Sequence, residues 1–290
     1  MRIRLKFIGA VAAVVVWAGA GFAQDAAALR LVPFPKQVRM QKDVFVLDRG
    51  LVLEAPAEAG ELLAKTIGAE LKRAGLPVPE TRSIEKGAIF LRLSTRGEGE
   101  RPAFKFRDGA TPEDYSLEVR QDAVVCAAPG EAGLFYAVQT LCQLVRANRR
   151  DGGLPCLEVR DWPSLRWRCF QDDMTRGPSS KPELLRSEVA LGAHLKMNLF
   201  TYYMEHQYAF KKHPLIGPEN GSLTPETLSQ LVTYAKRFHV DILGNQQSFG
   251  HFHHILKHEK YAHLRETPSL LCPVKEESYQ LLDDLYSEVC

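Results

Sequence analysis

Acidic, amide, guanidinium and imidazole side chains follow three apolar segments in the second half of the chain. Trp167–Asp172 runs into Asp173-Met174-Thr175-Arg176, Asn198–Met204 into Glu205-His206-Gln207, and Val240–Asn245 into the polar stretch that ends at His251. Many donors and acceptors with little net charge suit a polyhydroxylated ligand. The alternative is a structural ion pair of Asp172 or Asp173 with Arg176 on a solvated surface, and periodicity alone favours neither.

The histidines raise a second chemical hypothesis, because all nine fall between His194 and His263. His251, His253, His254, His258 and His263 offer spacings that a metal site can use, but the interleaved Glu of an HExxH motif is absent. We therefore interpret most of them as solvated surface side chains. We expect no metal site and no cofactor.

The elements that must position these residues alternate between strand and helix after Asp161-Trp162-Pro163. Helical spacing predicts helices over Lys181–Leu195, Thr224–Phe238 and Ser278–Val289. Repeated βα units predict a parallel sheet covered by helices, with its polar residues at the carboxyl ends of the strands. A complete (β/α)₈ barrel needs about 250 residues, so residues 160–290 suit only the first part of a TIM barrel or a smaller α/β sheet.

The first half has a different order of predicted strands and helices, without repeated βα units. This order indicates a small α/β domain of the two-layer α+β type over residues 28–158. The expected helices are Glu61–Ala74 and Glu131–Ala147, and Arg149–Gly153 is expected to be a linker. Strands are expected at Val44–Leu53, Ala88–Leu93, Tyr115–Val119 and Ala123–Cys126. The six cysteines are scattered without CxxC pairs, so Cys126, Cys142 and Cys169 are expected to pack as small apolar side chains.

The composition and the amino-terminal residues indicate the class of protein and its location. With 45% hydrophobic residues, 25% charged residues and a net charge of +2, the chain is typical of a globular protein and offers no electrostatic case for nucleic acid. Arg2, Arg4 and Lys6 precede a short apolar run that ends in small residues, which predicts a signal peptide over residues 1–23, cleaved after Ala23. The expected location is periplasmic or secreted, without a membrane segment after cleavage.

Several motifs resemble family 20 glycoside hydrolases, the β-N-acetylhexosaminidases, over the N-terminal part of that family. The similar segments are Leu31–Lys36, Tyr115–Val119 with Gly133–Leu141, Asp161-Trp162-Pro163 with Trp167-Arg168, Asp173-Met174-Thr175-Arg176, Lys196-Met197-Asn198 and Gly250-His251. Two places depart from the family: Tyr202–His206 stands where H-x-H-L-T-D-D is frequent, and Gly244-Asn245 where Pro-Glu is usual. The resemblance is therefore to a divergent branch.

The resemblance implies an α/β fold with a small N-terminal domain followed by an incomplete (β/α)₈ barrel. It also implies exo-acting removal of terminal GlcNAc or GalNAc from N-acetylated amino-sugar glycans by substrate-assisted retaining hydrolysis. Arg176 would bind sugar hydroxyls together with Glu205 and His251, supported by Asp173 and Asn245. The family's catalytic Asp-Glu pair ends the fourth barrel strand and is expected beyond Cys290, so this fragment alone is expected to be inactive.

Two other functions stay open at this point. One is a non-catalytic carbohydrate-binding protein that has a truncated barrel without the acid pair. The other is a different barrel hydrolase that uses Asp172 or Asp173 with Glu205 as its two carboxylates. A strand ending in Asp-Glu further along the gene would favour the hexosaminidase.

Overall fold

The computed structural model describes residues 26–48, 50–57, 60–84, 90–94, 104–150, 152–177 and 179–289. The signal peptide expected over residues 1–23 lies outside these described residues. Within the described part of the chain, no helix combines the length and the apolar character needed to cross a membrane.

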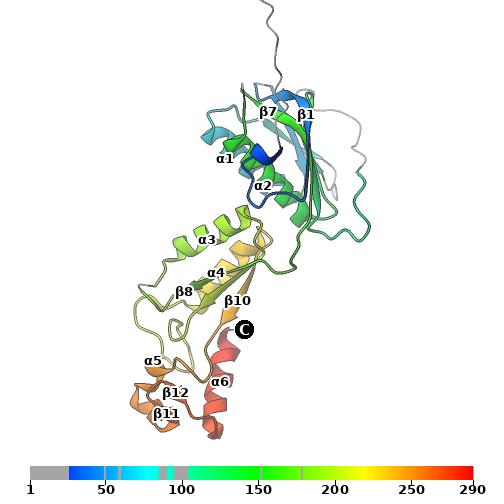
Figure 1. The fold of residues 1–290 in the computed structure, drawn as a ribbon. Helices are drawn as coiled ribbons and strands as arrows, with labels where there is room; N and C mark the ends of the chain where they lie inside the picture. Colours follow the sequence, from blue (N-terminus) through cyan, green and yellow to red (C-terminus); the bar gives the residue numbers. More distant parts are fainter. Residues whose placement is uncertain are drawn as a thin grey trace, which may run out of the picture.

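The first half forms a seven-stranded sheet with two helices packed against it (Figure 1). Its order is β1-β7-β5-β6-β4-β2-β3, and the neighbours are antiparallel except for β2 and β3. After η1 (Ala26–Ala28), the elements are β1 (Gln37–Val46), β2 (Val52–Pro56), α1 (Gly60–Arg73), β3 (Glu80–Ile84), β4 (Phe90–Ser94), β5 (Tyr115–Val119), β6 (Ala123–Ala127), α2 (Glu131–Ala147) and β7 (Gly153–Asp161).

The core of this half explains why its apolar segments adopt these elements. Every residue of β4 and β6 is buried, as expected for central strands covered on both faces. In α2 the side chains from Gly133 to Val145 are all buried, so the helix lies inside the molecule rather than at its surface. Cys126 and Cys142 are among the buried apolar residues, in agreement with the sequence.

The second half begins with three parallel strands in the order β10-β9-β8, covered on one face by α3 and α4 (Figure 1). The strands are β8 (Cys169–Asp173), β9 (Leu199–Tyr203) and β10 (Asp241–Asn245), and the helices are α3 (Pro182–His194) and α4 (Pro225–Lys236). Beyond them follow α5 (His253–Leu256), η2 (Glu259–Leu264), β11 (Arg265–Thr267), β12 (Leu270–Leu271) and α6 (Glu276–Val289). The expected α/β fold class is confirmed: a mixed α/β sheet domain precedes βα units of the TIM-barrel kind.

The pairing register assigns the side chains of the parallel strands to two faces. Phe170 is opposite Phe200, and the Phe200 ring lies against Gly192 of α3, so this row faces the helices. The alternate row, which includes Cys169, Gln171 and Asp173, faces away from them. Cys169 is exposed on β8, an edge strand of this sheet, which corrects the expectation that it packs as a buried apolar side chain.

Two further expectations about the first half were wrong. The single strand expected over Val44–Leu53 is the end of β1 and the start of β2, separated by a turn in which Gly50 has a φ of 91°. The expected linker at Gly152-Gly153 instead leads into β7, whose Gly153 pairs with Val46. A Cβ atom at Gly153 would lie 2.6 Å from the Phe45 carbonyl oxygen, so glycine here serves close strand pairing rather than chain flexibility.

Replacing Gly192 by alanine is expected to destabilise the protein, although alanine is the better helix former. A Cβ atom at this position would lie 2.4 Å and 2.5 Å from two carbons of the Phe200 ring, so α3 would have to move away from the sheet. Overpacking of this kind costs about 1–3 kcal/mol, against a helix-propensity gain of about 1 kcal/mol. Urea unfolding measures the difference, with Ser187→Ala on the exposed side of α3 as the control. A more stable Gly192→Ala protein would contradict the close packing.

Candidate functional site

The carboxyl ends of β8, β9 and β10 bring together the residues that the sequence singled out. Arg176 follows the end of β8 by three residues, Glu205 follows β9 by two, and His251 lies in the loop after β10. Because parallel neighbours end at the same edge of a sheet, these three loops share one rim. The structure brings Arg176 and His251 each into contact with Glu205.

Glu205 is the centre of this contact. Its Oε1 lies 3.3 Å and 3.4 Å from Nη1 and Nη2 of Arg176, and 3.4 Å from Nδ1 of His251. The Glu205 side chain is 2% exposed, whereas those of Arg176 and His251 are 55% and 57% exposed. A buried carboxylate thus anchors two surface groups that remain accessible to a ligand.

Tyr203 and Gln247 also belong to this site, and the sequence analysis missed both. The Tyr203 hydroxyl donates to Glu205 Oε1 at 2.8 Å and accepts from Gln247 Nε2 at 2.6 Å. The guanidinium carbon of Arg176 lies 5.8 Å from the centroid of the Tyr203 ring. Burial, together with the hydrogen bond to Glu205, raises the pKa of Tyr203 above its ordinary value, so the phenol keeps its proton. The two-residue spacing of Tyr203 and Glu205 was the available signal in the sequence.

The backbone at two of these residues is in the left-handed region. Glu205 has a φ of 44° and His251 a φ of 58°, and residues other than glycine rarely adopt such positive φ angles. Gln246 stabilises the first of these turns, because its Nε2 donates to the Glu205 carbonyl at 2.7 Å. Such conformations cost on the order of 1–3 kcal/mol and concentrate at functional sites.

The two supporting residues named from the sequence have different surroundings. Asp173 Oδ2 lies 3.5 Å from Arg176 Nε, and its Oδ1 accepts from the backbone and the hydroxyl of Thr175. Although burial alone would raise the pKa of Asp173, the Thr175 hydrogen bonds and the charge of Arg176 lower it below its ordinary value. The Asn245 amide instead donates to Gln171 at 3.4 Å, away from Glu205.

Strand alternation separates the two consecutive acids of β8. The Asp172 carboxylate accepts from the Ser180 hydroxyl at 3.3 Å, whereas the ion pair with Arg176 belongs to Asp173. Asp172 pairs in register with Tyr202, on the row that faces the helices. Asp172 and Glu205 therefore do not face each other across the rim as a pair of catalytic carboxylates.

Three histidine rings lie close together beside Glu205; His206 stacks on His254, whereas His253 is tilted by 45° against His254. The centroids of His206 and His254 are 3.9 Å apart, and those of His253 and His254 are 3.8 Å apart. Among the described residues, no group of three or more His, Cys, Asp or Glu side chains is arranged to hold a metal ion. Burial, with a smaller contribution from the charge of His254, lowers the pKa of His206 to about 4, so this ring is neutral near neutral pH.

This depressed pKa predicts that stability falls as the pH decreases. The pKa of His206 in the unfolded chain is near 6.5, so between about pH 6.5 and pH 4 the unfolded chain binds a proton that the folded protein excludes. Stability is therefore full above this window and is lost progressively through it, by about 1–2 kcal/mol after allowance for solvent screening. Chemical unfolding at pH 7 and pH 4.5 should show a smaller loss for His206→Gln than for wild type. His263→Gln, at an exposed position, should behave like wild type; an unchanged loss in His206→Gln would reject this assignment.

Comparison with known proteins identifies the first half directly. The family model described as glycosyl hydrolase family 20, domain 2, matches residues 28–162. A β-hexosaminidase of Porphyromonas gingivalis is 22% identical over 249 residues, which cover 77% of this chain and 30% of that protein. An N,N′-diacetylchitobiase of Vibrio harveyi is 34% identical over 84 residues, covering 29% of this chain and 9% of that protein.

Solved structures show the same fold across both halves. A chitobiase of Flavobacterium johnsoniae matches with a TM-score of 0.70 at 20% identity, covering 92% of this chain and 43% of that one. An N-acetyl-β-hexosaminidase of Streptomyces plicatus, in complex with Thio-NAglucal, matches with a TM-score of 0.69 at 21% identity, covering 89% and 56%. The chain thus spans about half of these two structures and less than a third of the two curated relatives. Together, these comparisons support the expected resemblance to a divergent member of glycosyl hydrolase family 20: residues 28–162 match its domain 2, and both halves of the chain share the fold of the solved chitobiase and N-acetyl-β-hexosaminidase.

Proposed function

We propose that this chain carries the sugar-positioning part of an exo-acting glycosidase that removes terminal N-acetylhexosamine residues, GlcNAc or GalNAc, from glycans. The observation that carries the proposal is the Arg176–Glu205–His251 contact at the carboxyl ends of three parallel strands, with a buried carboxylate and exposed cationic and imidazole groups. The names of the relatives, β-hexosaminidase and diacetylchitobiase, supply the sugar class.

The geometry of Arg176 suits a ligand with adjacent hydroxyl groups. Its contacts with Glu205 are long, at 3.3 Å and 3.4 Å, so sugar hydroxyls can replace them at little cost. A planar guanidinium offers several donors in fixed directions, which an ammonium group does not. Glu205, held by the hydrogen bond from Tyr203, remains beneath the guanidinium and balances its charge.

The reaction we propose is substrate-assisted retaining hydrolysis. In this scheme the oxygen of the substrate's 2-acetamido group attacks the anomeric carbon, and an enzyme acid protonates the leaving oxygen. Glu205 already accepts from Tyr203 and lies against Arg176, and Asp173 accepts from Thr175, so both side chains serve positioning. The resemblance to family 20 implies that a separate Asp-Glu pair supplies the acid and its partner. No cofactor is required by this scheme.

We also propose export of the protein, from the charged and apolar pattern of residues 1–23. Sequencing the amino terminus of the mature protein, purified from the periplasm or the medium, should give Gln24 first. An unprocessed protein retained in the cytoplasm would reject this location.

The activity is tested on the full-length protein that contains these residues. An aryl N-acetyl-β-glucosaminide should be cleaved, whereas the matched aryl β-glucoside, which lacks the 2-acetamido group, should react more slowly by orders of magnitude. Binding of N-acetylglucosamine without cleavage would instead establish the carbohydrate-binding alternative. Equal rates on both aryl glycosides would reject substrate assistance.

A further inference from the structure

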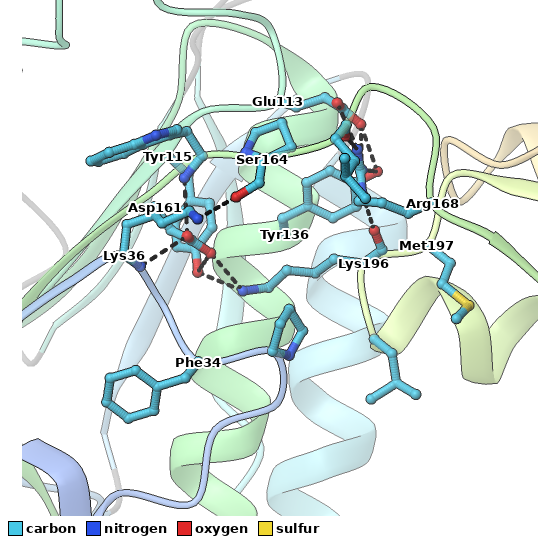
Figure 2. Close-up of a pocket in the computed structure, with 15 residues that line it drawn as sticks. Phe34, Lys36, Glu113, Tyr115, Tyr136, Asp161, Ser164, Arg168, Lys196 and Met197 are labelled. Atoms are coloured by element: carbon cyan, nitrogen blue, oxygen red, sulfur yellow. Dashed lines mark hydrogen bonds and ion pairs between the residues drawn. The ribbon is translucent and has the colours of Figure 1, made fainter.

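A pocket of about 310 Å³ lies where the sheet domain meets the βα units (Figure 2). Residues just before β8 and β9 line it, so it is at the opposite ends of these strands from Arg176 and Glu205. Its walls are mostly apolar and come from five separate parts of the chain. Among the wall residues are Phe34, Trp162, Pro163, Leu165, Leu195 and Met197.

The charged groups at this pocket do not balance, because three cations and two carboxylates line it. Lys196 Nζ pairs with Asp161 at 3.1 Å, and Arg168 pairs with Glu113 at 2.6 Å. The remaining cation is Lys36, whose Nζ donates to the neutral hydroxyl of Ser164. Within the described part of the chain, the structure gives the Lys36 ammonium no carboxylate partner.

We propose that this pocket binds a small amphipathic carboxylate, with its apolar body between the walls and its carboxylate on the Lys36 ammonium. The volume lies at the lower end of the range of small-molecule sites. The surplus positive charge favours an anion, and an ammonium–carboxylate hydrogen bond is stronger than the present one to a hydroxyl. The apolar walls offer few partners for the many hydroxyls of a sugar, so this site differs in chemistry from the Arg176 site.

Two test ligands of nearly equal shape isolate the role of the charge. We expect 3-phenylpropanoate to bind with a millimolar Kd, the affinity typical of a ligand of roughly a dozen non-hydrogen atoms. The neutral 3-phenylpropanamide should bind about tenfold more weakly. Titrations followed by NMR should shift the indole N–H of Trp162 and the methyl group of Met197, which both line the pocket. N-acetylglucosamine should shift neither signal.

Variants of two lysines complete the test. Lys36→Gln should remove the preference for the anion, whereas Lys42→Gln, at an exposed position of β1 outside the pocket, should leave it unchanged. Equal affinities of the wild-type protein for the two ligands would overturn the proposal. It would equally be overturned by undiminished anion preference in Lys36→Gln, or by no shift of either signal at saturating ligand. None of these outcomes depends on whether the protein is a glycosidase.

Discussion

Replacing Arg176 by alanine in the complete protein should lower kcat/KM for an aryl N-acetylglucosaminide by a factor on the order of a hundred or more. Each hydrogen bond between a charged donor and a sugar hydroxyl contributes about 1.5–3 kcal/mol, and the fork of Arg176 can make two of them. Part of the loss should appear in kcat, because contacts away from the reacting carbon help to hold the sugar in its reactive conformation. Steady-state kinetics with saturating substrate separates kcat from KM.

A structural role for Arg176 makes a different prediction. If Arg176 only neutralised Asp173 and Glu205, Arg176→Ala would lower the melting temperature while the folded fraction kept near-normal turnover. The Arg176 side chain is 55% exposed and Glu205 keeps the hydrogen bond from Tyr203, so we expect a smaller loss of stability than for Lys196→Met. Arg176→Lys keeps the charge but loses the fork, so it should recover little activity. Arg237→Ala, at an exposed position after α4, is the control. A near-normal kcat/KM in Arg176→Ala would show that Arg176 does not bind the substrate.

Replacing Lys196 by methionine should lower the free energy of unfolding by about 3–5 kcal/mol, a larger loss than that expected for Gly192→Ala. Lys196 is 6% exposed and Asp161 8% exposed, and the ammonium donates to both Asp161 and the Tyr115 hydroxyl. Burial lowers the pKa of Lys196, and the charge of Asp161 counteracts only part of this effect. Removing the ammonium leaves the Asp161 carboxylate buried without its countercharge, while methionine retains most of the side-chain volume.

A double-mutant cycle distinguishes the ion pair from loss of packing. Asp161→Asn combined with Lys196→Met should be less destabilised than the sum of the single variants, because the double variant buries no unpaired charge. Chemical unfolding of the wild type, the two single variants and the double variant supplies the four free energies of unfolding, and Lys42→Met on the exposed part of β1 serves as the control. Additive effects would show that Lys196 and Asp161 act independently. This pair joins β7 to the α3–β9 connection, so its loss should also loosen the contact between the two halves of the chain.

The local spacing of apolar residues in the sequence was sufficient to predict much of the fold. Period-2 and helical spacing predicted β5, β6, α2 and the three parallel strands, because burial of one face or of the whole element constrains consecutive residues. The same reasoning placed Arg176, Glu205 and His251 at strand ends. It failed at β7, where Gly152-Gly153 suggested a linker, because only pairing with Val46 more than a hundred residues earlier makes Gly153 part of a strand.

The sequence by itself determined which polar residues follow which strands, since strand direction and alternation depend on neighbours in the chain. Only the tertiary structure decided which of them meet. The burial of Glu205 beneath Arg176, the contacts of Tyr203 with Gln247, and the choice of Asp173 over Asp172 as the partner of Arg176 depend on how separate loops and faces pack. Lys196 and Asp161 are 35 positions apart, and Lys36 and Ser164 are 128 apart. Contacts over such separations leave no periodic signal, because packing of whole elements brings the two side chains together.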